Sequence, residues 1–113
     1  MGGKRILVID DDQSILSLFT LILQRKGHMA DTAKTGFEAL ERISRKLYNI
    51  ALIDVVLPDM SGLDLLDNIP SETRKIVITG VLTEDSRVRA RLKGADDYLL
   101  KPVKPEKLLE LIG

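Results

Sequence analysis

The sequence predicts an α/β fold in which a parallel sheet is covered by helices on both faces. Apolar, partly β-branched runs of a few residues, typical of strands buried on both faces, alternate along the chain with segments of helical periodicity. The connections are short, and strands that alternate with helices in this way pair in parallel. With 113 residues and no linker or low-complexity stretch, we expect one domain that spans residues 1–113.

The first expected strand is residues 5–9, a buried run that ends at three consecutive acids. A helix follows, indicated by five apolar residues at helical spacing: Ile15, Leu18, Phe19, Ile22 and Leu23. Gly27 marks its end. Residues 28–33 form a weaker strand. Thr35 and Glu38 make a capping-box pattern, which predicts a second helix with three apolar residues on one face: Phe37, Leu40 and Ile43.

The most apolar strand is expected within residues 49–58, bounded by Asn49 and Pro58. Ser61 and Gly62 begin a short helix that ends at Pro70. Residues 75–79 form the fourth strand. Residues 83–93 are ambiguous: apolar and basic residues alternate as in a strand, but acids in the first turn and Gly94 just past the end favour a helix.

Residues 98–100 form the fifth strand, and Pro105 at a first helical position opens the last helix, with three residues facing inward: Leu108, Leu109 and Ile112. Five strands and five helices joined by right-handed crossovers predict a flavodoxin-like, doubly wound (βα)5 fold with strand order 2-1-3-4-5.

Composition excludes several classes of function. Seventeen basic and seventeen acidic residues cancel, so no overall field favours direct binding of nucleic acid or a membrane surface. The absence of cysteine excludes disulfides and thiolate chemistry, and a single histidine excludes multi-histidine metal sites. Met1-Gly2 starts as a myristoylation signal does, but Ile6 stands where Ser or Thr is required. No apolar run approaches the ~20 residues of a membrane span, so the expected location is the cytoplasm.

Polar side chains follow four of the five strands directly. Asp10 and Asp11 come after the first strand, Asp54 after the third, Thr79 ends the fourth and Lys101 follows the fifth. In doubly wound sheets, ligands bind outside the carboxyl ends of the strands, at the point where the strand order reverses. Strands 1 and 3 are neighbours in the predicted order, so their three carboxylates should converge.

Asp54 alone would most simply be a turn residue that accepts a hydrogen bond from its own backbone. The convergence changes that interpretation, because two carboxylates ~5 Å apart repel by roughly 3 kcal/mol at an effective dielectric of ~20. A Mg²⁺ ion would relieve the repulsion, while Lys101 and Thr79 suit a phosphoryl group. The chemistry that fits is phosphoryl transfer onto a carboxylate nucleophile, for which we choose Asp54.

Four stretches in this order carry a resemblance to a known family: ILVIDD at residues 6–11, DVVLPDMSG at 54–62, TG at 79–80 and GADDYLLKP at 94–102. With them, the chain resembles the receiver domain of two-component response regulators over nearly its whole length. The resemblance implies that Asp54 accepts a phosphoryl group from a sensor histidine kinase or phosphotransfer protein. It also implies that Mg²⁺ is bound by Asp10 (mainly through water), Asp11, Asp54 and the backbone carbonyl of Val56.

The resemblance further implies that Thr79 and Lys101 contact the phosphoryl oxygens, and that movement of Thr79 is coupled to inward rotation of Tyr98. This switch would remodel the face formed by the helix at 83–93, the strand at 98–100 and the last helix, where a homodimer could form. Lys101-Pro102 is often a cis bond in this family. Gly80 replaces the usual alanine, and the third helix is shorter than usual.

Two alternatives remain beside a regulatory phosphoacceptor that is not an enzyme in the ordinary sense. A haloacid-dehalogenase-type phosphatase shares the chemistry, but it needs an acid two residues after the nucleophile, where this chain has Val56. A degenerate receiver acting as a constitutive adaptor is disfavoured by the complete set of site residues. Val56 and Val81, two residues beyond Asp54 and Thr79, cannot hydrogen-bond an attacking water, so we expect slow autodephosphorylation.

Other features have plainer interpretations. Asp12 is expected to cap a helix and His28 to lie on the surface. The basic residues Arg87, Arg89 and Arg91 are taken as a solvated face, with a partner surface as the alternative. The sequence ends just past the last helix, so the chain is either a stand-alone receiver or one domain of a longer protein. The kinase, the signal and the output cannot be read from it.

Overall fold

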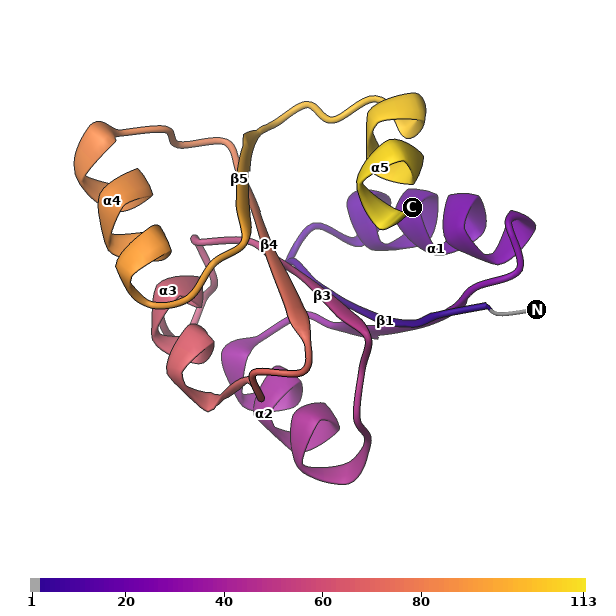
Figure 1. Cartoon of the computed structure of the whole chain (residues 1–113), viewed down its shortest axis with the longest axis horizontal. Helices are drawn as coiled ribbons and strands as arrows, with labels where there is room; N and C mark the ends of the chain where they lie inside the picture. Colours follow the sequence, from indigo (N-terminus) through magenta and orange to yellow (C-terminus); the bar gives the residue numbers. More distant parts are fainter. Residues whose placement is uncertain (1–2) are drawn as a thin grey trace.

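A computed structural model describes residues 3–113; the Met1-Gly2 start lies outside them. Its central feature is a parallel sheet of five strands in the order β2-β1-β3-β4-β5, which confirms the predicted topology (Figure 1). The strands occupy β1 Arg5–Ile9, β2 Met29–Ala33, β3 Ile50–Ile53, β4 Arg74–Thr79 and β5 Asp97–Leu100.

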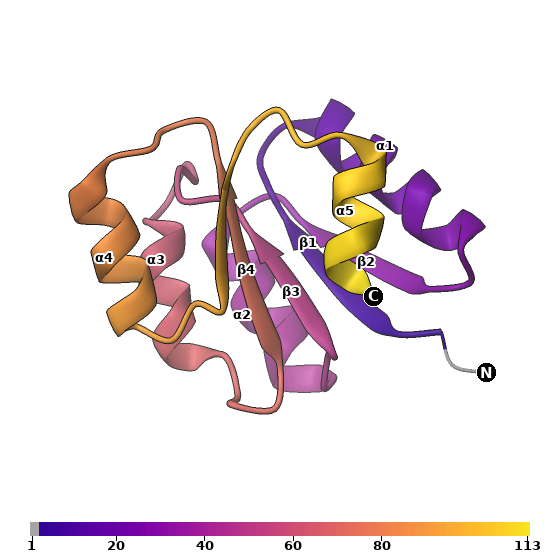
Figure 2. The same ribbon diagram turned by 45° about the horizontal axis from the view of Figure 1, so that its top comes forward.

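Helices cover both faces of the sheet. Figures 1 and 2 show α1 and α5 together on one face, and α2, α3 and α4 on the other. Their bounds are α1 Gln13–Arg25, α2 Gly36–Arg45, α3 Gly62–Leu65, α4 Glu84–Leu92 and α5 Pro105–Ile112. A single 3-10 turn, Leu66–Asn68, extends α3, so the third helix is short, as expected. Within residues 3–113, no helix has the length and hydropathy to cross a bilayer.

The core has two parts because the strands place alternate side chains on opposite faces. In β1, Ile6 and Val8 pack towards α1 and α5, while Leu7 and Ile9 pack towards α2 and α3. All four are at most 1% exposed. The central strands are therefore apolar on both faces, which explains why they appear in the sequence as continuous rather than alternating apolar runs.

Two helical faces differ from the sequence prediction. Leu18 of α1 is 47% exposed, and Phe37 of α2 is 65% exposed. The side chains that α1 buries are Leu16, Phe19 and Leu23, and α2 buries Ala39. Residues two positions apart in an α-helix lie about 200° apart around the axis. Leu18 therefore points away when Leu16 faces the core, and Phe37 points away when Ala39 does.

Side chains at the helix starts confirm the predicted caps. Asp12 accepts a hydrogen bond from the backbone N–H of Ser14, and Thr35 accepts one from Glu38. The reciprocal bond of the capping box is shifted by one residue, because Glu38 accepts from the N–H of Lys34. Residues 84–92 form a helix, capped by Thr83, which settles the ambiguity of that segment.

Candidate functional site

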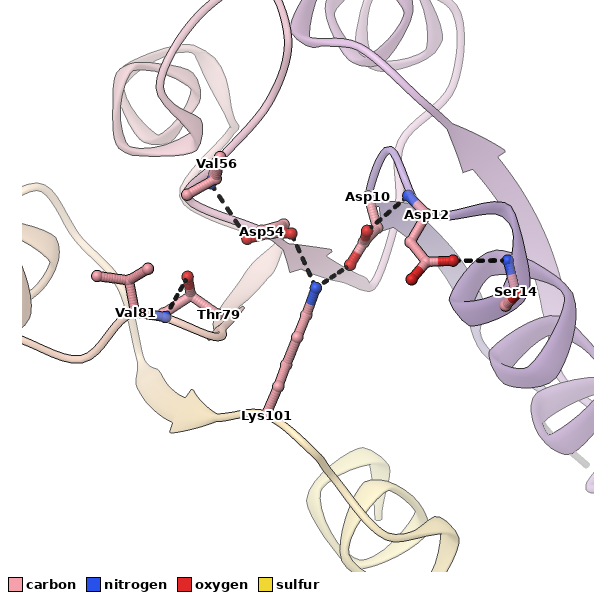
Figure 3. Close-up of polar contacts among 8 residues, drawn as sticks. All are labelled: Asp10, Asp12, Ser14, Asp54, Val56, Thr79, Val81 and Lys101. Atoms are coloured by element: carbon pink, nitrogen blue, oxygen red, sulfur yellow. Dashed lines mark hydrogen bonds and ion pairs between the residues drawn. The ribbon is translucent and has the colours of Figure 1, made fainter.

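Carboxylates from two adjacent strands meet at the carboxyl edge of the sheet (Figure 3). Ile9 pairs with Ile53 in the β1–β3 register, so the next residues, Asp10 and Asp54, leave the sheet side by side. The N–H of Asp54 donates to the carbonyl of Ile9 at 2.9 Å, which continues the pairing by one bond. The predicted convergence of these acids is therefore a consequence of strand register.

Asp10, Asp11 and Asp54 form an acidic triad, in which one carboxylate oxygen of each lies within 4.8 Å of the others. Asp10 is 4% exposed and Asp54 is 6% exposed, whereas Asp11 lies open to solvent. Oδ1 of Asp10 accepts a hydrogen bond from the N–H of Asp12. Two of the three charges are thus held out of water, where their mutual repulsion is least screened.

Lys101 reaches this triad from the end of β5. Its Nζ lies 2.6 Å from Oδ2 of Asp10 and 2.8 Å from Oδ2 of Asp54, so one ammonium group bridges both buried carboxylates. The peptide bond from Lys101 to Pro102 is cis, as the resemblance implied. Three carboxylates and one ammonium leave a formal charge of minus two.

The environment raises the pKa of both Asp10 and Lys101, for different reasons. Burial raises the pKa of Asp10, although the hydrogen bond from Lys101 opposes the shift. Burial disfavours the charged form of Lys101, but the hydrogen bonds to Asp10 and Asp54 outweigh it and raise the pKa of Lys101. The lysine therefore stays charged, but its single positive charge does not neutralise the three carboxylates.

The triad fits a hard divalent cation. Oxygen atoms of three carboxylates lie close enough to share one ion, and the formal charge of minus two equals what such an ion would neutralise. Mg²⁺ typically binds through one or two carboxylates together with phosphate oxygens. The residues present could therefore hold a metal ion, which the sequence also predicted.

The loop after Asp54 explains both interpretations of that residue. Oδ1 of Asp54 accepts a hydrogen bond from the N–H of Val56 at 3.1 Å, so Asp54 does form the turn contact that its position in the sequence suggested. Oδ2 is the oxygen that meets Lys101. Gly62 packs against the carbonyl of Asp54 so closely that a Cβ would lie 1.9 Å from that oxygen. Only glycine fits there.

Thr79 and Tyr98 are connected through the backbone of one residue, Val81. Thr79 is fully buried, and its Oγ1 accepts a hydrogen bond from the N–H of Val81 at 3.3 Å. The carbonyl of Val81 accepts a hydrogen bond from the hydroxyl of Tyr98 at 3.1 Å. Tyr98 also shares a 2.8 Å hydrogen bond with Ser86 of α4. The residue between the threonine and the tyrosine is thus bonded to both.

Three contacts in the structure were not predicted from the sequence. Ser86 offered no signal beyond a hydroxyl in a helix, and the capping of α2 by Asp59 joins residues more than twenty positions apart. His28 was expected on the surface, but it is half-buried and its Nδ1 accepts a hydrogen bond from the N–H of Lys4. The three arginines of α4 are exposed, as expected of a solvated face.

The response regulator receiver domain family matches residues 6–113. The chain belongs to that family. Receiver domains are regulatory phosphoacceptors of two-component signalling, with histidine kinases as partners. The receiver is 36% identical over 111 residues to the transcriptional regulatory protein DltR of Streptococcus agalactiae, with 96% of this chain and 50% of that protein aligned. It therefore spans about half the length of this relative.

Solved structures agree with the assignment. A CheY-like receiver domain protein from Methanospirillum hungatei has a TM-score of 0.94 and 40% identity, covering 98% of this receiver and 91% of that chain. A response regulator from Burkholderia pseudomallei with a phosphorylated aspartic acid and a calcium ion has a TM-score of 0.91 and 30% identity, covering 97% and 66%. The beryllofluoride-activated NtrC4 receiver domain dimer has a TM-score of 0.88 and 39% identity, covering 96% and 92%.

Proposed function

We propose that this receiver domain is a phosphorylation switch in which Asp54 accepts a phosphoryl group from the phosphohistidine of a sensor histidine kinase or phosphotransfer protein. The observation that supports the proposal is the position of Asp54, which is buried, has two other carboxylates within 4.8 Å and lies 2.8 Å from the ammonium of Lys101. A carboxylate beside a positive charge and a metal-binding set is suited to attack phosphorus, because charge on the transferring group is neutralised on several sides.

In the proposed reaction, a carboxylate oxygen of Asp54 attacks the phosphorus atom of the donor. A P–O bond forms to Asp54, the P–N bond to the donor imidazole breaks, and that nitrogen takes up a proton from solvent. Lys101 holds an oxygen of the phosphoryl group, and Thr79 donates its hydroxyl to another. Asp11, Asp54 and the backbone carbonyl of Val56, with Asp10 mainly through water, would hold Mg²⁺, which would supply charge neutralisation and alignment.

The proposed switch uses the backbone of Val81. If Thr79 turns its hydroxyl towards a phosphoryl group, its bond to the N–H of Val81 must lengthen or break. The carbonyl of the same residue accepts a hydrogen bond from the Tyr98 hydroxyl, so a displacement at Thr79 would pass to Tyr98 and, through Ser86, to α4. Phosphorylation would then be reported on the face formed by α4, β5 and α5.

That face is the proposed partner surface, either for an output partner or for a second copy of the chain. It exposes apolar side chains on α4 and β5, and it carries both signs of charge: Val88, Leu92, Leu100, Arg87, Arg91 and Asp96. A surface with both signs of charge can be self-complementary in a two-fold dimer. The dimeric NtrC4 receiver lends support to this possibility.

The deciding experiment is phosphorylation by acetyl phosphate with Mg²⁺, followed by intact-mass measurement. The wild-type domain should gain one phosphoryl group, and Asp54→Asn should gain none. Absence of both a phosphoadduct and Mg²⁺ binding in the wild type would favour the adaptor interpretation instead. Steady turnover of small phosphomonoesters would favour the phosphatase, against which the apolar Val56 argues.

A further inference from the structure

We propose that Asp59 is a positioning residue that ties the loop between β3 and α3 to the start of α2. It thereby holds the backbone carbonyl of Val56 in place for the cation. The inference rests on the proposed function, because it concerns the affinity of the same site for Mg²⁺. Asp59 itself lies at the exposed tip of the loop, five residues after Asp54.

Both carboxylate oxygens of Asp59 accept a hydrogen bond from α2. Oδ1 lies 2.8 Å from the backbone nitrogen of Gly36, and Oδ2 lies 2.9 Å from that of Phe37. These are the first two N–H groups of the helix, which have no partner within it. A carboxylate is the favoured acceptor at this end because of the helix dipole. The two N–H bonds hold the pKa of Asp59 below its usual value, so the cap stays charged.

A steric contact closes the same junction. A Cβ at Gly36 would lie 2.4 Å from the side chain of Met60, the residue after Asp59. The half-buried Met60 therefore occupies space that a larger residue at position 36 would take. The bidentate cap and the Met60 contact are independent, and both join the loop tip to the first residue of α2.

The base of the loop is held at the site itself. The N–H of Gly62 donates to the carbonyl of Val55 at 2.7 Å, and Val56 pairs with Ser61 in an antiparallel bridge. The N–H of Val56 donates to Asp54. The base is therefore paired and the tip is bound to α2. The carbonyl of Val56 belongs to the peptide group that leads from the base towards the tip, so it lies between the two restraints. Release of the tip should therefore make the position of the Val56 carbonyl less restrained.

Mg²⁺ demands near-ideal octahedral geometry, so a ligand that must be ordered on binding lowers the affinity. Calorimetric titration of Asp59→Ala with Mg²⁺ should therefore give a dissociation constant about tenfold above that of the wild type, the lower end of the effect of a lost supporting contact. The rate of phosphorylation by acetyl phosphate at saturating Mg²⁺ should stay at the wild-type value, because the intact ligands are restored once the ion is bound.

Thr35→Ala is the matched control. It removes a 3.0 Å cap bond, to the N–H of Glu38, from the same end of α2 without touching the loop. It should lower thermal stability as Asp59→Ala does but leave the Mg²⁺ affinity unchanged. Asp59→Asn retains one acceptor oxygen and should fall between the wild type and Asp59→Ala.

Hydrogen exchange of the Gly36 and Phe37 amides verifies that the cap is lost in Asp59→Ala. If these amides lose protection while the Mg²⁺ affinity equals that of Thr35→Ala, the inference is wrong and the proposed function stands. A wild-type domain that binds no Mg²⁺ would instead overturn the proposed function and the inference with it.

Discussion

The ammonium of Lys101 lies 2.8 Å from Oδ2 of Asp54, across 47 positions of sequence. The same nitrogen is 2.6 Å from Oδ2 of Asp10, so a single cation from the last strand joins the two central strands at their carboxyl ends. Lys101 is thus part of the fold as well as of the proposed chemistry. Removal of the Lys101 ammonium should therefore change both the stability of the domain and its rate of phosphorylation.

Replacement of Lys101 by Met should lower the free energy of unfolding by about 2 kcal/mol in the absence of Mg²⁺, because two buried carboxylates lose their counter-ion. Phosphorylation by acetyl phosphate should slow about 100-fold, since a positive group facing the transferring oxygens is lost. Urea denaturation and intact-mass kinetics measure the two effects. Lys107→Met, which breaks an exposed ion pair with Glu110, is the control and should change neither.

Mg²⁺ should stabilise the wild-type domain, because the ion binds a carboxylate set that exists only when β1 and β3 are paired. A concentration 100 times the dissociation constant should add about 2.7 kcal/mol to the free energy of unfolding. Asp11→Asn should largely remove this gain, whereas Asp12→Asn, which keeps the helix cap and lies outside the triad, should retain it. Equal stabilisation of both variants would contradict the assigned ligands.

Tyr98→Phe should separate phosphorylation from its structural consequence. The variant loses the hydroxyl that meets the Val81 carbonyl and Ser86, but it leaves the acidic triad untouched. We expect phosphorylation at the wild-type rate, with smaller changes of amide chemical shift in α4 on phosphorylation. Two-dimensional NMR of the free and phosphorylated forms measures this, and identical shift changes in wild type and variant would show that Tyr98 has no part in the switch.

The phosphorylated form should be long-lived. Val56 and Val81 are both exposed beside the site, and neither side chain can hydrogen-bond a water molecule that attacks phosphorus. Val56→Asn adds a polar side chain at one of these positions and should speed hydrolysis about tenfold, as followed by intact mass after removal of acetyl phosphate. Decay of the wild-type phosphoprotein within seconds in Mg²⁺ would refute the prediction.

Stability should fall at low pH partly through Asp31. The hydroxyl of Tyr48 at 2.6 Å and the ammonium of Lys46 at 3.0 Å hold the pKa of Asp31 below its usual value. Its contribution to stability is therefore present above the unfolded-state pKa and is lost as pH falls through the lower folded-state value. Asp31→Asn should flatten the acid limb of a stability–pH curve, while Asp64→Asn at an exposed position should not.

Asp10 contributes to the pH dependence of stability with the opposite sign. Burial raises its pKa in the folded domain, so the stability linked to its proton is present at low pH and declines as pH rises through the raised value. Comparison of Asp31→Asn with wild type cancels this contribution, because Asp10 is common to both.

Much of the site could be predicted because its residues lie at the carboxyl end of a strand or within two positions after it. A run such as Ile50–Ile53 is recognisable by its apolar residues alone, and the residue after it must lie at the sheet edge. Strand order then brings Asp10 beside Asp54. The helical faces were predicted only in part: Leu40 and Ile43 of α2 pack against the core as expected, whereas Leu18 and Phe37 have plausible spacing but are exposed.

The sequence by itself determined the alternation of strands and helices and the set of polar residues at one edge of the sheet, since both depend on local periodicity. The tertiary structure alone decided that Lys101 bridges Asp10 and Asp54, that the Val81 backbone joins Thr79 to Tyr98, and that Asp59 caps α2. These contacts depend on the distance between segments that are far apart in the chain. No local pattern specifies that distance, because it follows from how the helices pack against the sheet.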